Sequence, residues 1–307
     1  MLSQLVNRAE PLGPEAKVLV LGGGFSGSCV VRMMQALGTP VVSTRRCPEP
    51  GRGDLGFDSA TGLEPTARDL EGVSHVLSTI PPTREGVDPA LDRLGPPLNS
   101  LSPTWVGYLS TTGVYGDRRG DWVSESDAAC PSQDRSRRRL DCEQAWLSSG
   151  LPVQILRLPG IYGPGRSVLE GLISKRVRRI NKPDQVFCRI HVEDIAGACL
   201  HLMHKAAAGI APAVVNIVDD EPAPSAELLE FGAELLGCEP PAEESYAEAS
   251  QTMSAMAQSF WSENRRVSNR LLCEQLGYTL LHPNYRDGLR DCLEQKRQSA
   301  AGSPMIN

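Results

Sequence analysis

Short apolar runs that alternate with helix-length segments constrain the fold of this chain more than any other feature. Six such runs occur, at 17–22, 40–44, 74–80, 105–111, 153–158 and 213–218. They are nearly continuous in apolar residues, as strands buried on both faces of a parallel sheet are. Helical candidates lie between them at 25–37, 66–72, 88–100, 135–149 and 192–206. This alternation predicts an α/β fold built on a doubly wound parallel sheet.

The charge balance and the cysteine content exclude several classes of protein. Lys and Arg total 31 against 37 Asp and Glu, a net charge of −6, which argues against a nucleic-acid-binding protein. Nine cysteines without a C-x-x-C pair argue against a disulfide framework or a zinc ribbon. No run reaches the ~20 apolar residues that a membrane-spanning helix needs. We therefore expect a cytoplasmic monomer or homodimer that binds no nucleic acid and no membrane.

A glycine-rich loop follows the first apolar run. In LVLGGGFSG, Gly22, Gly24 and Gly27 have the spacing G-x-G-x-x-G. The first glycine permits a tight turn, the second lets the backbone approach a pyrophosphate, and the third lets the helix pack against the strand. The N–H groups that begin this helix, near Phe25 and Ser26, would face the anion. A tight turn that binds nothing is the alternative, but the strand-to-helix junction predicts a dinucleotide site.

The end of the second apolar run indicates which dinucleotide binds. An NAD site carries an acid at this point, but VVSTRR has Thr44, Arg45 and Arg46 instead. Guanidinium groups suit a 2′-phosphate, so NADP is expected, with NAD as the alternative. In the other interpretation, both arginines are solvated charges of a loop.

The pattern also predicts how the chain is divided. A Rossmann-type nucleotide-binding domain is expected over 17–218, with 166–189 contributing to the substrate side. The region 219–295, where prolines separate shorter helices, is expected to form a small C-terminal substrate lobe. Residues 1–16 and 296–307 are expected to form a flexible arm and a flexible tail.

Three further motifs follow in order: STTGVYGD at 110–117, RLPGIYGPGR at 157–166 and RIHVEDIAGA at 189–198. With the glycine loop, this order resembles the extended and atypical short-chain dehydrogenase/reductases, the NAD-dependent epimerase/dehydratase group, over residues 17–290. Two C-terminal stretches, NRRVSNRLLCEQLGY and YRDGL, look like those of the bacterial YeeZ-like proteins. The resemblance implies a nicotinamide cofactor and a small-molecule substrate.

The resemblance also implies a set of catalytic residues, from which the chain departs. In the family, a serine or threonine polarises the substrate oxygen, and Thr111 has this position. The next helix normally carries Tyr-x-x-x-Lys, and Leu140 and Glu143 fix its register. Arg139 then replaces the lysine and Arg135 replaces the tyrosine. An arginine keeps the positive charge but releases no proton near neutral pH, so the usual acid/base group is missing.

Three explanations of the missing tyrosine remain open. Another residue supplies the proton, the nearest candidates being Tyr115 and Tyr162. Alternatively, the protein binds NADP without turnover, or the loop before Leu140 has a different register. Packing of the Tyr115 ring beneath the cofactor is the structural alternative to catalysis at that position.

The same motifs imply further contacts and one buried histidine. Pro81 and Pro159 are expected beside the cofactor, and Tyr162 and Arg166 on the substrate side. His191 is expected to be a satisfied, half-buried side chain, and no residue is expected to bind a metal. The sequence thus predicts an NADP-dependent oxidoreductase or epimerase/dehydratase-like enzyme that acts on a small carbonyl or sugar-like metabolite. The alternative function is a non-catalytic NADP(H)-binding regulatory or redox-sensing protein.

Overall fold

A computed structural model describes residues 3–48 and 54–301 of the chain. Its centre is a seven-stranded parallel sheet with the strand order β11-β7-β5-β4-β1-β2-β3. The strands are β1 (Val18–Leu21), β2 (Val41–Arg45), β3 (Asp54–Gly56), β4 (His75–Ser78), β5 (Trp105–Thr111), β7 (Val153–Leu158) and β11 (Val214–Asn216). The predicted doubly wound fold is confirmed, and each of the six apolar runs is a strand of this sheet.

The edge strand β3 was not predicted from the sequence. It has three residues, Asp54, Leu55 and Gly56, and all three are only half-buried. A strand this short at the edge of a sheet needs no apolar run, so the period-based signal is absent.

The strand order reverses between β1 and β4, which pair in parallel from Val18 with His75 to Leu21 with Ser78. In open α/β sheets, a ligand-binding crevice forms outside the carboxyl ends of the strands at such a point. The fold therefore directs attention to the loops that follow β1 and β4.

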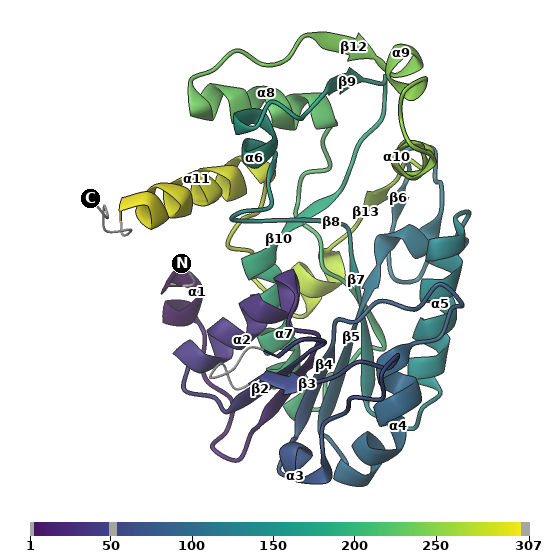
Figure 1. Cartoon of the computed structure of the whole chain (residues 1–307), viewed down its shortest axis with the longest axis vertical. Helices are drawn as coiled ribbons and strands as arrows, with labels where there is room; N and C mark the ends of the chain where they lie inside the picture. The colour runs from purple at the N-terminus through teal and green to yellow at the C-terminus, as the bar shows by residue number, and fades with distance from the viewer. Residues whose placement is uncertain (1–2, 49–53, 302–307) are drawn as a thin grey trace.

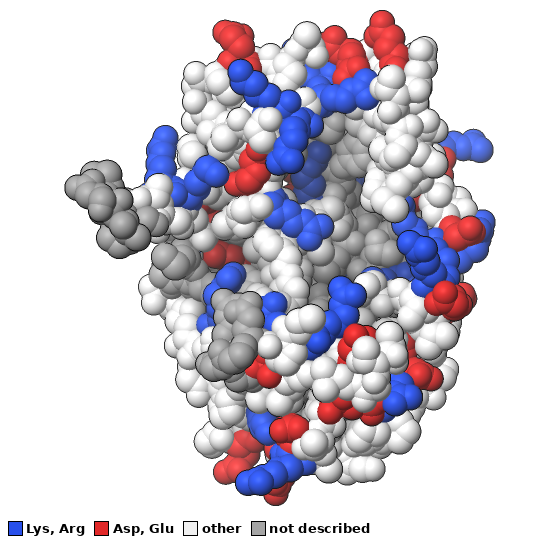
Figure 2. Space-filling model, in the orientation of Figure 1, with Lys and Arg blue, Asp and Glu red and all other residues white. Residues whose placement is uncertain are grey.

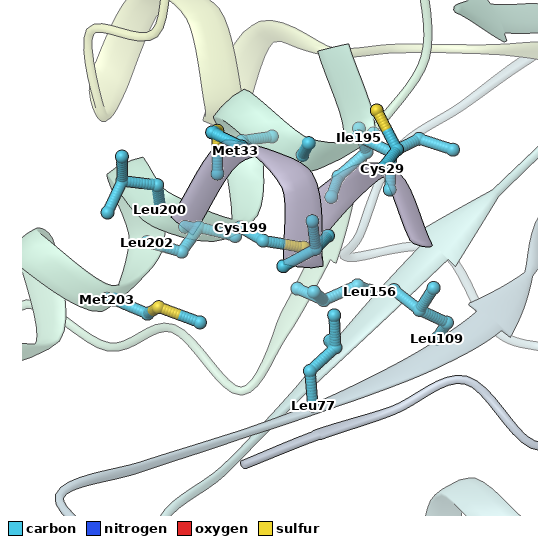
Figure 3. Close-up of a cluster of buried hydrophobic side chains, with 14 of the residues drawn as sticks. Cys29, Met33, Leu77, Leu109, Leu156, Ile195, Cys199, Leu200, Leu202 and Met203 are labelled. Carbon is cyan, nitrogen blue, oxygen red and sulfur yellow. The ribbon is translucent and has the colours of Figure 1, made fainter. Parts of the chain in front are cut away.

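Helices cover both faces of the sheet (Figure 1). The helices of this layer are α2 (Phe25–Ala36), α3 (Ala67–Leu70), α4 (Pro89–Leu101), α5 (Asp134–Leu147) and α7 (Val192–Ala207). On one face, α2 and α7 bury a cluster that includes Met33, Ile195 and Met203 (Figure 3). On the other face, Leu94 of α4 and Trp146 of α5 pack against the strands. All five helices lie where the sequence predicts them.

Helix α1 (Ser3–Arg8) differs from the expected flexible arm. Its Leu5 is buried in the same cluster as α2 and α7, because an apolar side chain near the N-terminus finds a groove between them. At the other end, α11 (Tyr285–Ala301) continues through the first half of the expected tail. Residues 1–2 of the expected arm and 302–307 of the expected tail lie outside the described residues.

A smaller lobe lies above the carboxyl ends of the strands (Figure 1). In it, α6 (Val168–Ile173) packs on α8 (Ser225–Leu236) through Leu172, Leu229 and Ala233. The other elements of this lobe are β9 (Arg179–Asn181), β12 (Glu243–Ser245), α9 (Tyr246–Ser250) and α10 (Ala255–Trp261). Two short parallel pairs connect it to the sheet: β8 (Gly160–Tyr162) with β10 (Arg189–His191), and β6 (Trp122–Val123) with β13 (Arg266–Val267).

No helix among the described residues is both long and apolar enough to span a bilayer.

Candidate functional site

The glycine loop lies at the carboxyl end of β1, where the strand order reverses. Gly22 has φ +99°, a conformation that favours glycine, and its N–H donates to Thr44 Oγ1 at 3.0 Å. The Thr79 hydroxyl donates to the Gly22 carbonyl at 2.7 Å. A Cβ on Gly22 would lie 2.5 Å from the Thr79 hydroxyl oxygen. The loops after β1, β2 and β4 are thereby joined into one rigid turn.

The other two glycines have opposite surroundings. A Cβ added to Gly27 would lie 2.1 Å from the Gly22 carbonyl oxygen, so this glycine brings α2 against the loop. A Cβ added to Gly24 would meet nothing within 4 Å. Gly24 is the N-cap of α2, and no side chain caps this helix. The N–H groups at its start, near Phe25 and Ser26, therefore face open space, as an anion site at a helix N-terminus requires.

The residues that end β2 do not act as one group. Thr44 is buried and supports the glycine loop. Arg45 is half-buried, with Nε 2.8 Å from Asp54 Oδ2 and Nη2 donating to Ser28 Oγ at 3.1 Å. Arg46 is exposed and has no hydrogen-bond or ion-pair partner among the described residues. Of the two arginines, Arg46 is thus the one with a fully available guanidinium.

Two adjoining cavities lie at the carboxyl ends of β4 and β5. The larger, of about 430 Å³, is lined by Thr111, Arg135 and Pro159, and by residues of the small lobe. The smaller, of about 320 Å³, is lined by Thr111, Arg135, Arg139 and Pro81. Thr111 and Arg135 border both cavities, so the two meet at the end of β5. Figure 2 shows this face hollowed between the two lobes, with Lys and Arg gathered around the hollow.

Thr111 is held at the end of β5 by local hydrogen bonding. Its Oγ1 accepts the Gly113 N–H at 3.1 Å, which leaves the hydroxyl proton free to point elsewhere. Directly before it, Ser110 donates to the buried carboxylate of Glu143 on α5. Glu143 also accepts from Arg157 of β7 at 2.7 and 3.1 Å. This buried ion pair fixes β5, β7 and α5 relative to one another behind the cavities.

Two of the four arginines of α5, Arg135 and Arg139, lie one helical turn apart and face the same side. Arg139 Nη1 donates to the Tyr108 hydroxyl at 2.9 Å and to the Leu109 carbonyl at 3.2 Å. Arg135 Nη1 donates to Ser259 Oγ at 2.7 Å, and its guanidinium lies 4.1 Å from the Phe260 ring centroid. The helix thus presents these two positive charges toward the cavities, and a third, on Arg138, also lines the smaller one.

The positions of Tyr115 and Tyr162 do not favour the proton-donor role that the sequence suggests for them. Tyr115 is fully buried, and its hydroxyl donates to Asn216 Oδ1 at 2.9 Å. Burial raises the pKa of this phenol above its usual value. Tyr162 is buried beside His191, and its hydroxyl lies 3.5 Å from the Asn284 carbonyl oxygen. Neither tyrosine lines either cavity, because both rings are used to pack the fold.

Arg166 also differs from its expected place on the substrate side. It is exposed, and its guanidinium lies 5.3 Å from the ring of Phe25, the first residue of α2. The loop after β8 therefore brings a positive charge over the glycine loop and not into the larger cavity. Pro159, expected beside the cofactor, lines the larger cavity.

Most of the larger cavity is formed by residues that the sequence did not single out. Arg189, Phe187 and Trp261 of the small-lobe side line it, together with Glu263 and Arg265. Arg265 Nη1 donates to Glu263 Oε2 at 2.7 Å, so these two charges neutralise each other. Arg189 and Arg265 lie in two of the quoted motifs, but no spacing connects those motifs, and the residues converge only through the pairing of β8 with β10 and of β6 with β13.

One histidine cluster is more extensive than the sequence predicted. Possible metal-binding atoms of His191, Glu193, His282 and Asp291 all lie within 4.8 Å of one another. His191 is fully buried, and not half-buried as expected; its Nδ1 accepts the Glu193 N–H at 3.3 Å. The pKa of His191 is lowered to about 3 by burial and by His282. Hydrogen bonds and opposite charges thus hold the cluster together at the start of α7.

Comparison with known proteins identifies related chains of similar fold. No family model matches the chain. A functionally unknown conserved protein from Silicibacter pomeroyi DSS is 38% identical, with a TM-score of 0.82, over 91% of this chain and 99% of that one. MoeE5 in complex with UDP-glucuronic acid and NAD shares the fold at 24% identity and a TM-score of 0.70, over 92% of this chain and 100% of that one. A curated relative is the 3-diazoavenalumate denitrifying reductase of a Streptomyces species, 30% identical over 159 residues. That match spans about half of each chain, 50% of this one and 51% of the reductase.

Proposed function

We propose that this chain is a member of the extended short-chain dehydrogenase/reductase superfamily and acts as an NADP-dependent reductase of a small metabolite with a carbonyl or similar electrophilic group. The observation that carries this proposal is the shared border of the two cavities. Thr111 and Arg135 line both, so a cofactor along the loops after β1 and β4 and a substrate below the small lobe would meet there. NADPH, when bound, supplies the hydride.

The cofactor fits the residues of the crevice. The open space at Gly24 and the uncapped start of α2 suit a pyrophosphate. Arg46 has a free guanidinium for a 2′-phosphate, and Arg45 lies beside it. MoeE5 binds NAD in a similar fold, so our assignment of NADP depends on these two arginines and not on the fold.

The side chains favour reduction over epimerisation or dehydration. Those reactions require a side chain that removes a proton from the substrate. Arg135 and Arg139 cannot do so near neutral pH, and no described tyrosine lines the two cavities. The Glu263 carboxylate lines the larger cavity, but it is paired with Arg265. Reduction of a carbonyl instead builds negative charge on one oxygen. The Thr111 hydroxyl and the two guanidinium groups stabilise this charge, and water supplies the proton.

The experiment has two stages. NADPH and NADH affinities are first measured by calorimetry, and the expected result is a preference for NADPH of at least about tenfold. Loss of the reduced nicotinamide absorbance is then followed with a panel of aldehydes, ketones and activated aromatic compounds. Turnover by the parent and its loss in Thr111→Val would support the reductase.

A second candidate is a non-catalytic NADP(H)-binding regulator. The absence of a tyrosine from the described lining of both cavities favours it, because an acid/base group is dispensable for binding alone. Tight NADPH binding without turnover of any panel compound would favour this candidate. Failure to bind either nucleotide would contradict both functions.

A further inference from the structure

Arg189 is a buried positive charge that forms no ion pair with a carboxylate among the described residues. It begins β10, is only 7% exposed and lines the larger cavity. Its Nη1 donates to the Phe187 carbonyl at 2.9 Å and to the Ala223 carbonyl at 3.0 Å. These two carbonyls are its only hydrogen-bond partners among the described residues, and no carboxylate lies within ion-pair distance. A buried guanidinium with unused donors is costly unless an anion reaches it.

Two other arginines near the cavities, Arg157 and Arg265, differ from Arg189 in this respect. Arg157 is equally deep but has a bidentate pair with Glu143. Arg265 is paired with Glu263 at 2.7 Å. Arg135, like Arg189, has no acidic partner within ion-pair distance and lines the same cavity. The cavity therefore carries an excess of positive charge from Arg135 and Arg189.

Asp219 interacts with Arg189 electrostatically, but the two side chains form neither a hydrogen bond nor an ion pair. Asp219 donates its N–H to the Arg189 carbonyl at 2.9 Å, but its side chain lines a different cavity, with Trp122 and Asn269. Burial raises the pKa of Asp219 well above its usual value, which favours its neutral form. Arg189 acts in the opposite direction on this pKa, so Asp219 compensates the guanidinium charge only in part.

We propose that the larger cavity binds a substrate with an anionic oxygen group, a carboxylate or a phosphate, and that Arg189 receives this group. The inference rests on the proposed function, which makes this cavity the substrate site. Phe187, Phe260 and Trp261 form apolar walls, and Phe187 and Trp261 pack edge to face at 5.1 Å between ring centroids. The ligand is therefore an organic anion with a flat or apolar body. A volume of about 430 Å³ suits a small metabolite of this kind.

The test uses matched pairs of anionic and neutral probes on the full chain saturated with NADP⁺. One pair is 4-hydroxycinnamate and its methyl ester, and the other is phenyl phosphate and phenol. Calorimetry should give at least about tenfold tighter binding for the anion of one pair, and added salt should weaken it. The pair with the greater discrimination distinguishes carboxylate from phosphate recognition.

Arg189→Met should remove the preference for the anion, and Arg189→Lys should keep part of it. Because Arg189 also holds two backbone carbonyls, Arg135→Met provides a second variant, and it should weaken anion binding without touching those carbonyls. Arg93→Met alters an arginine on α4 that pairs with Glu64, so it should retain the preference and serves as the control. NADP⁺ affinity, measured for every variant, reports whether the fold and the cofactor site survive.

The outcomes separate this inference from the proposed function. If the parent chain does not bind NADP⁺, the proposed function fails. If NADP⁺ binds but each anion binds no better than its neutral partner, or no probe binds, the inference alone is overturned. Undiminished discrimination in both Arg189→Met and Arg135→Met would overturn it as well.

Discussion

The two halves of the crevice are built in different ways. The cofactor half is formed by a continuous segment, β1, the glycine loop and α2, in which backbone conformation and missing Cβ atoms create the space. The substrate half is assembled from β5, α5, β8, β10 and the 260s, and its character comes from side-chain charge. The largest loss of binding in the first half should therefore come from added volume, and in the second half from lost charge or lost hydrogen bonds.

The largest expected effect tests the volume of the cofactor half. Gly24→Val should abolish NADPH binding, because its side chain fills the space where a pyrophosphate approaches α2. The fold should persist, since a Cβ at Gly24 meets no atom within 4 Å. Calorimetry measures the binding, and thermal unfolding measures the stability.

The control is the same substitution at Gly27, the last glycine of the loop. In Gly27→Val, the new Cβ would lie 2.1 Å from the Gly22 carbonyl oxygen, so the Tm should fall clearly. If Gly24→Val bound NADPH like the parent, the dinucleotide would lie elsewhere.

This contrast explains how much of the molecule is predictable from the sequence. The glycine spacing, the six strands and the five sheet-covering helices depend on local patterns, and all were predicted. Other contacts were not predicted: the hydrogen bonds of Thr44 and Thr79 to Gly22, and the pairing of Arg45 with Asp54. They join strands that are adjacent in the sheet but not in the sequence.

The catalytic side was less predictable for the same physical reason. Thr111 and Arg139 could be located by motif register, and both line a cavity. Tyr115 also lies in a motif, but the motif does not reveal that its hydroxyl donates a hydrogen bond to Asn216, which lies far away in the sequence. That Arg189 forms no ion pair among the described residues is likewise a property of the folded chain only.

The second prediction removes one hydrogen bond from the border of the two cavities. Thr111→Val should lower turnover by about 10²–10³-fold, the usual effect of losing one donor aimed at a developing oxyanion. NADPH affinity should change little, because the open crevice at Gly24 and α2 does not depend on this hydroxyl. Thr111→Ser keeps the hydroxyl and should restore most of the rate. Equal turnover in Thr111→Val and the parent would remove Thr111 from the mechanism.

The third prediction concerns charge in the cofactor half. Replacing both Arg45 and Arg46 by alanine should weaken NADP⁺ binding by at least about tenfold and NAD⁺ binding much less. Arg46→Ala alone should account for most of this loss, because Arg45 is partly engaged by Asp54 and Ser28. Titration of each variant with both nucleotides measures the ratio. Equal affinities of the parent for NAD⁺ and NADP⁺ would contradict the assignment of NADP.

The smallest expected effect concerns stability behind the substrate half, at Asp219. Neither carboxylate oxygen of this buried residue has a hydrogen-bond partner among the described residues. Because burial raises its pKa well above the usual value, the folded chain holds the proton more tightly than the unfolded chain. Ionisation therefore favours unfolding, and the parent loses stability as the pH rises above about 4, near the ordinary pKa of an aspartate.

An asparagine cannot ionise, so Asp219→Asn should avoid this loss. The Tm of Asp219→Asn should equal that of the parent near pH 4 and exceed it near pH 8, since only the parent loses proton-linked stability as the pH rises. Asp220→Asn changes the exposed neighbour and controls for the substitution itself. A lower Tm of Asp219→Asn at pH 8 would mean that Asp219 is ionised and acts as the counter-ion of Arg189. The statement that the substrate half of the crevice carries uncompensated positive charge would then be wrong.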